Sequence, residues 1–253
     1  MSNNAPGVIV WRELHADSLE KADAFYTALA DWTGKTQQME GMGDYVVWRQ
    51  GEKMLAGAMN KPNAEAPPHW LDYFYTEDLE ATVDTIVEEG GTVIMGPSEI
   101  PGMGRFAIAA DPTGAVFAPF HSNWKEAPTD ERPDDFTFCW TQVNSTDMHA
   151  SAAFFAKVFN WEVNEMPGDD EVVSLNVGEH SIISVMQMPE DSEAPSHFID
   201  YLAVPDIAEY HEKATGLGAM GYVPPTDIPT MGAFSVLADT NGAIFALWED
   251  RSA

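Results

Sequence analysis

The chain contains one long internal repeat, and this repeat limits the folds that the chain can adopt. Residues 97–120 and 225–248 are identical at twelve of 24 positions when they are aligned with a shift of 128. Unrelated segments of this composition would share about one or two. The segment that begins at Trp11 aligns with the segment that begins at Trp140. The repeat is therefore the duplication of a whole domain, because solenoid repeats have periods of only about 20–50 residues.

Each copy shows the same order of predicted elements. In the first copy, residues 8–14 alternate like a strand, and residues 18–32 have apolar side chains at helical spacing with Ser18 as the N-cap. The order strand, helix and three strands then occurs twice in each copy, and Asp111 opens the turn before the last strand. We expect domains over residues 7–121 and 136–250. The charged, proline-containing residues 122–135 are expected to form a linker.

Three local features carry a family resemblance. Phe25 and Tyr26 stand late in the first helix, Gly90 and Gly91 end the second, and the Asp-Pro-Thr-Gly turn precedes the last strand. In this order they resemble the vicinal oxygen chelate superfamily of glyoxalases, bleomycin resistance proteins and ring-cleaving dioxygenases. The resemblance covers nearly the whole chain and is nearest to two-domain bacterial members of glyoxalase-like type. It implies an α+β fold of two tandem domains. Each domain would have two βαβββ modules that form a curved mixed sheet cup with helices packed outside.

The resemblance also implies a divalent metal at the base of each cup, held by His, Glu or Gln side chains near the middle of the strands. In this chain the corresponding positions lack such side chains in both copies, and they are Trp11, Leu71 and Ala118 with Trp140, Ile199 and Ala246. The remaining strands, residues 54–59 and 181–186, contain no His, Asp or Glu. We therefore expect no cofactor, although the resemblance leaves a divalent metal open.

Strand alternation predicts which side chains face the cups. Glu13 and His15 share the face of Trp11, and Gln142 and Asn144 share the face of Trp140. Aromatic and Met-lined pockets of this kind suit a flat, partly apolar small molecule. The predicted ligand-binding residues of the two cups are Trp11, His15, Leu71, Tyr73, Met103, Ala118, Trp140, Gln142, Asn144, Tyr201, Met231 and Ala246.

Glu13 is the candidate catalytic residue. A carboxylate beside an indole in a partly apolar cup would have a raised pKa and could act as a general base. A salt bridge or a solvated position is the structural alternative. The counterpart Gln142 cannot take a proton, so a reaction would occur in the N-terminal cup. We interpret His69 and His197 as hydrogen-bonding residues at strand edges, and Cys139 as a packed thiol.

These residues favour a glyoxalase/bleomycin-resistance-like protein that binds a small aromatic or dicarbonyl molecule in a cup without the family's metal ligands. It would be a binder or a metal-independent enzyme. One alternative is a metal-dependent lyase or dioxygenase with ligands at non-standard positions such as Glu13, His15 or His69. Another is a structural or interaction protein without a ligand, whose fused domains mimic a dimer.

Charge limits the partners. The chain has 41 acidic and 12 basic residues, a formal net charge of −29. Such a surface repels nucleic acid phosphates and anionic lipid, so neither nucleic acid nor membrane is an expected partner. No apolar run approaches the about 20 residues that cross a bilayer. The single Cys139 fits a reducing compartment. We expect a cytoplasmic protein that is a monomer with pseudo-dimeric domains or a homodimer.

Overall fold

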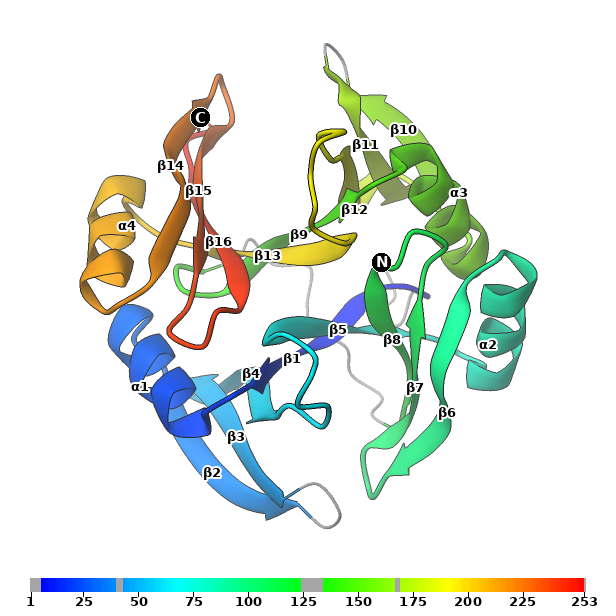
Figure 1. Cartoon of the computed structure of the whole chain (residues 1–253), viewed down its shortest axis with the longest axis horizontal. Coiled ribbons are helices and arrows are strands. Elements are labelled where there is room, and N and C mark those ends of the chain that lie inside the picture. Colours follow the sequence, from blue (N-terminus) through cyan, green and yellow to red (C-terminus); the bar gives the residue numbers. More distant parts are fainter. Residues whose placement is uncertain (1–5, 40–42, 124–133, 167–168, 253) are drawn as a thin grey trace. The chain divides into compact units, whose positions relative to one another are not determined.

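A computed structural model describes residues 6–39, 43–123, 134–166 and 169–252 (Figure 1). Residues 124–133 of the predicted linker lie outside the described residues. The elements of the first repeat are β1 (Ile9–Ala16), α1 (Leu19–Leu29), β2 (Thr33–Met39), β3 (Gly43–Gln50), β4 (Lys53–Asn60), β5 (His69–Tyr75), α2 (Leu79–Glu88), β6 (Thr92–Ile100), β7 (Gly104–Ala110) and β8 (Val116–Ser122). Those of the second are β9 (Phe138–Ser145), α3 (Met148–Phe159), β10 (Glu162–Met166), β11 (Asp169–Val177), β12 (His180–Gln187), β13 (His197–Ala203), α4 (Ile207–Gly216), β14 (Met220–Ile228), β15 (Gly232–Ala238) and β16 (Ile244–Asp250).

The strands form two mixed sheets of eight with the same order. The first runs β2-β3-β4-β1-β5-β8-β7-β6, and the second runs β10-β11-β12-β9-β13-β16-β15-β14. Strands β1 and β4 pair in parallel, as do β5 and β8, whereas the hairpin neighbours are antiparallel. The α+β class, the tandem domains and the βαβββ order with helices outside the sheets are therefore confirmed.

Local chemistry explains where the helices begin. The Ser18 hydroxyl accepts a hydrogen bond from the backbone N–H of Lys21, which confirms the predicted N-cap of α1. Asp78, Asp147 and Asp206 cap the other three helices in the same way. These side chains satisfy backbone donors that have no partner inside the first helical turn.

The chain divides into two compact units, and each unit takes one module from each repeat. Unit 1 comprises Met1–Val10, Leu71–Glu131 and Thr141–Phe198; unit 2 comprises Trp11–Trp70, Arg132–Trp140 and Ile199–Ala253. Helix α2 contacts α3 in unit 1, and α1 contacts α4 in unit 2, as Figure 1 shows. The aromatic core of each unit therefore contains side chains from both repeats.

Over the residues that the structure describes, no helix is both long and apolar enough to span a membrane.

Candidate functional site

Strand β1 places three predicted residues on one face. The Nε2 of His15 donates a hydrogen bond to Oε1 of Glu13 at 3.0 Å. Glu13 is 3% exposed and His15 is 5% exposed. Trp11, two residues earlier, is half-buried. Glu13 is therefore a buried carboxylate with a histidine partner on the same face of β1, and the prediction that this face lines a cup stays a prediction.

Strand β3 adds Tyr45 to this group, which the sequence alone did not indicate. The indole N–H of Trp11 donates to the Tyr45 hydroxyl at 2.8 Å, and this hydroxyl is hydrogen-bonded to Glu13. Burial, the charge of Glu13 and this hydrogen bond raise the pKa of Tyr45 well above its usual value. Tyr45 therefore stays a neutral phenol at physiological pH and keeps its proton as a hydrogen-bond donor.

Tyr45 can occupy this place because the neighbouring strand carries a glycine. A Cβ on Gly57 would lie 2.1 Å from the Tyr45 hydroxyl oxygen. Gly57 also stands opposite Glu13 in the pairing of β1 with β4. Tyr45 and Gly57 together were the sequence signal for this contact. The signal could be recognised only once the register of β1, β3 and β4 was known.

His69, at the start of β5, stands beside His15. Their ring centroids are 4.8 Å apart in an edge-to-face arrangement. The Nδ1–H of His69 donates to the Pro67 carbonyl at 2.9 Å, so its Nε2 is an acceptor when the ring is neutral. Burial, and secondarily the nearby His15, lowers the pKa of His69. The interpretation of His69 as a hydrogen-bonding residue at a strand edge is confirmed.

We call this group the Glu13 cluster, and it consists of Trp11, Glu13, His15, Tyr45 and His69. Its five side chains belong to unit 2. It combines a carboxylate that can accept a proton, a phenol that stays protonated and an indole face. This is the donor and acceptor set that general acid–base chemistry requires.

Unit 2 also contains the apolar half of the second predicted cup. Trp140, Tyr201 and Ala246 lie in one cluster with Ile199, and Tyr201 pairs with Ala246 across β13 and β16. Burial raises the pKa of Tyr201 to about 12. The thiol of the half-buried Cys139 donates to the Tyr201 carbonyl at 3.3 Å, and burial raises its pKa to about 12, in agreement with the interpretation of a packed thiol.

Unit 1 contains two further groups of predicted residues. Tyr73 pairs with Ala118 across β5 and β8, and its ring contacts Phe106 and Phe120. Leu71 is buried earlier on β5. In the second repeat, the Gln142 side-chain amide donates to Oδ1 of Asn144 at 2.6 Å. The prediction that residues of unit 1 and unit 2 line common cups stays a prediction.

The two predicted rim methionines lie at turns. Met103 stands between β6 and β7, and its carbonyl accepts from the Asn123 backbone just beyond β8. The equivalent Met231 accepts from the Arg251 backbone beyond β16 and is 47% exposed. Both methionines are therefore near strand ends, several residues along their strands from the pairs Tyr73–Ala118 and Tyr201–Ala246.

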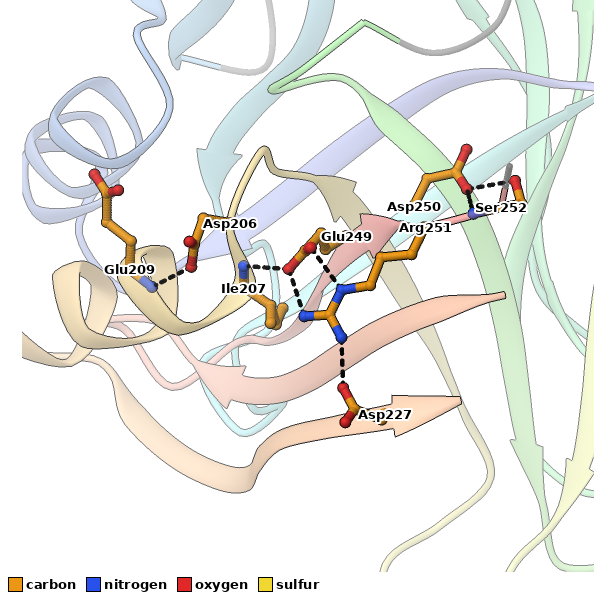
Figure 2. Close-up of polar contacts among 8 residues, drawn as sticks. All are labelled: Asp206, Ile207, Glu209, Asp227, Glu249, Asp250, Arg251 and Ser252. Atoms are coloured by element: carbon orange, nitrogen blue, oxygen red, sulfur yellow. Dashed lines mark hydrogen bonds and ion pairs between the residues drawn. The ribbon is translucent and has the colours of Figure 1, made fainter. Parts of the chain in front are cut away.

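A surface depression of about 240 Å³ lies elsewhere, at the start of α2. It is lined by Glu77, Asp78, Leu79, Glu80, Arg105 and His121. In the second repeat Glu249 stands at the position of His121, and Figure 2 shows how it accepts from the Ile207 backbone and from Arg251. Arg251 also binds Asp227 of β14. Because these contacts cap α4 and join strand ends, we interpret this region as structural in both repeats.

The fold and the paired sheets define the class of protein. The model of the Glyoxalase/Bleomycin resistance protein/Dioxygenase superfamily matches residues 9–118, and the model of the Glyoxalase-like domain matches residues 140–248. The chain belongs to this superfamily and carries two tandem copies of its domain. The family resemblance inferred from the sequence is confirmed.

Among individual proteins, the chain is 29% identical to "Putative glyoxylase CFP32" of Mycobacterium bovis over 94% of this chain and 92% of that one. It is 26% identical to the anthracycline biosynthesis protein DnrV of Streptomyces peucetius over 99% and 96%. Similar solved structures are a Mn(II)-bound glyoxalase from Novosphingobium aromaticivorans and the 2,3-dioxygenase LapB from Pseudomonas sp. KL28. The glyoxalase has a TM-score of 0.67 and 15% sequence identity, and the match covers 97% of this chain and 82% of the glyoxalase. LapB has a TM-score of 0.66 and 13% identity, and the match covers 97% of this chain and 93% of LapB.

The positions to which the resemblance assigns the family's metal carry no metal-binding side chain in this sequence. Indole and alkyl groups, such as those of Trp11, Ala118 and Ala246, offer no lone pair to a metal. Across residues 6–39, 43–123, 134–166 and 169–252, no group of three or more His, Cys, Asp or Glu side chains is placed to hold one. We therefore assign no step to a metal.

Proposed function

We propose that the chain binds a small, planar, partly apolar molecule of aromatic or dicarbonyl type at the Glu13 cluster, where Glu13 acts as a metal-independent general base. The observation that carries this proposal is the buried Glu13 carboxylate, which His15 and Tyr45 hold beside the half-buried Trp11. A carboxylate ion is an acceptor with about four lone-pair sites, so it can take a further proton while it is held.

The reaction class is proton abstraction next to a carbonyl group. Glu13 takes a proton from the carbon, the C–H electron pair forms the C=C bond of an enolate, and the carbonyl oxygen gains the negative charge. Return of a proton from Glu13 to the carbon restores the ketone. His15 is a positioning residue that orients the carboxylate through Oε1. The protonated Tyr45 supplies a neutral donor in the same group.

The ligand class is supported by the side chains and by the names of two relatives. The Trp11 indole offers an apolar face for a planar molecule. One relative is named as a glyoxylase and another is named for anthracycline biosynthesis, and anthracyclines are polycyclic quinones. Aromatic dicarbonyl compounds combine both features and are the ligands to test first.

The charge of the chain supports a small-molecule partner. A net charge of −29 opposes contact with nucleic acid or anionic membranes. We further propose a cytoplasmic protein, because the single Cys139 is a packed thiol, and either a monomer or a homodimer.

The test uses 1-phenylpropane-1,2-dione, an aromatic dicarbonyl with exchangeable methyl hydrogens. We expect the wild-type protein to catalyse exchange of these hydrogens with deuterium oxide, measured by proton NMR. Glu13→Gln should reduce the rate at least about a hundredfold, because a general base contributes about 10²–10⁴-fold. Gln142 stands at the equivalent place in β9, so Gln suits this strand position.

The matched control is Glu52→Gln in the exposed β3–β4 turn, which should leave the deuterium exchange rate unchanged. Equal rates for Glu13→Gln and wild type would refute the proposal.

A second candidate function is a metal-dependent lyase or dioxygenase, and the similarity to a Mn(II)-bound glyoxalase favours it. Metal analysis of protein purified without chelator distinguishes the two. Stoichiometric manganese, iron or zinc, together with loss of exchange after chelation, would support the second candidate. Exchange that persists in metal-free protein would support the first.

A further inference from the structure

The second repeat carries a polar group at the same strand positions as the Glu13 cluster. On β1, Glu13 stands opposite Gly57 and His15 stands opposite Met59. On β9, Gln142 stands opposite Ser184 and Asn144 stands opposite Met186. The strand register therefore matches Glu13 with Gln142 and His15 with Asn144, and an amide replaces a titratable group at both places.

These amides form a connected network in unit 1. The Gln142 Nε2 donates to Asn144 Oδ1 at 2.6 Å and to the Met186 sulfur at 3.2 Å. The Ser184 hydroxyl donates to Gln142 Oε1 at 3.4 Å. Asn144 Nδ2 lies 3.5 Å from the Nε2 of His197. We call this group the Gln142 cluster, and it consists of Gln142, Asn144, Ser184, Met186 and His197.

In both repeats a hydroxyl group donates to the side chain at this strand position, Glu13 or Gln142. The hydroxyl comes from a different strand in each repeat. In the first repeat Tyr45 of β3 reaches Glu13 over Gly57. In the second repeat Val172 takes the register position of Tyr45, and Ser184 takes the position of Gly57 and supplies the hydroxyl itself. The same hydrogen bond is thus made in two ways, which indicates that the polar group at this place has a use beyond filling the strand.

The Gln142 cluster is more accessible than its counterpart. Gln142, Asn144 and His197 are half-buried, whereas Glu13 and His15 are buried. The cluster contains no carboxylate and no ammonium group. The Nδ1–H of His197 donates to the Pro195 carbonyl at 2.8 Å, so its Nε2 is an acceptor in the neutral ring.

We propose that the Gln142 cluster is a second small-molecule site, which binds an uncharged carbonyl or hydroxyl compound through Gln142 and Asn144 and performs no proton abstraction. Side-chain amides are both donors and acceptors, so they suit uncharged polar ligands, and they cannot remove a proton from carbon. Only the choice of ligand class rests on the proposed function. The two repeats then form one reactive site and one binding site.

The test observes the two side-chain amides directly. In a ¹⁵N-labelled protein, the NH₂ resonances of Gln142 and Asn144 are assigned by their disappearance in Gln142→Leu and Asn144→Leu. On titration with 1-phenylpropane-1,2-dione, both resonances should shift saturably, and the exposed Gln37 and Asn63 amides serve as internal controls. The shifts should persist in Glu13→Gln, because Glu13 belongs to unit 2 and the Gln142 cluster belongs to unit 1.

The possible outcomes separate this inference from the proposed function. Saturable amide shifts without deuterium exchange would support the second site and refute the role of Glu13. Deuterium exchange without amide shifts would support the role of Glu13 and refute the second site. Shifts that vanish in Glu13→Gln would overturn the second site, because the probe would then bind at the Glu13 cluster only. Amide resonances that never move overturn it as well.

Discussion

At the scale of single residues, the site depends on which side chains share one small space between strands. Gly57 leaves the volume that the Tyr45 ring and hydroxyl occupy. The Tyr45 hydroxyl is hydrogen-bonded to Trp11 and Glu13. The glycine at position 57 of β4 therefore influences the environment of the Glu13 carboxylate on β1. In the second repeat Ser184 and Val172 fill the equivalent positions. A side chain at position 57 is therefore incompatible with Tyr45 in its present place.

This dependence predicts a coupling between positions 45 and 57. Gly57→Ser places a Cβ 2.1 Å from the Tyr45 oxygen and should reduce the free energy of unfolding by about 1–3 kcal/mol. Tyr45→Val should also destabilise the protein, because Trp11 loses its acceptor. The double variant should lose less than the sum of the two, by about 1 kcal/mol or more, as measured by urea unfolding. Gly96→Ser is the control, because no atom lies within 4 Å of its added Cβ. Additive losses would show that the two residues do not compete for space.

At the scale of elements, one turn in each repeat fixes a helix of the other repeat. Asp111 accepts from the backbone N–H groups of Thr113 and Ala115 in the β7–β8 turn, and from the Ser151 hydroxyl on α3. Asp239 has the same role in the β15–β16 turn, where Tyr26 of α1 donates to it at 3.1 Å. Asp111, which the sequence pattern assigned to its turn, therefore also joins the two repeats within unit 1, and Asp239 joins them within unit 2.

The contacts of Asp111 predict a large cost for its removal. Asp111→Ala leaves buried N–H and hydroxyl donors without their acceptor, and the free energy of unfolding should fall by about 3 kcal/mol. Asp111→Asn keeps one oxygen and should cost less. Asp147→Ala, which removes an exposed N-cap of α3, is the comparison and should cost about 1 kcal/mol. Thermal unfolding of the three variants measures this, and equal losses for Asp111→Ala and Asp147→Ala would contradict the role of the turn.

The order of elements was predictable because most strands and helices carry their own apolar period. Strand β2 was not located, because residues 33–38 are polar and exposed and pair as the edge strand of the sheet. In the site, alternation along β1 predicted that Glu13 and His15 share a face. Tyr45 was missed because its contact with Glu13 depends on the register between separate strands. Sequence alone also gave no information on which helix packs against which, since that choice is made by tertiary contacts.

At the scale of the whole molecule, neither repeat has a complete core by itself. In unit 2 the buried Tyr26 and Trp48 of the first repeat share a cluster with Leu202 and Phe245 of the second. In unit 1 the ring of Phe117 lies 5.2 Å from that of Phe155. If the repeats were separated, each core would lose the buried side chains that the other repeat contributes. Burial of such aromatic surface is the main source of stability in a domain of this kind.

We therefore predict that the two halves of the chain fold only together. Residues 1–126 and 127–253, expressed separately, should each lack a native near-UV circular dichroism spectrum, and mixing them should restore it. The halves carry formal charges of −11 and −18, so their association should strengthen as salt increases and screens the repulsion. Phe155→Asp in the second half should abolish complementation, whereas Ala153→Asp on the exposed side of α3 should not. A folded, monomeric first half on its own would contradict the prediction, because its helices would then need no partner from the second repeat.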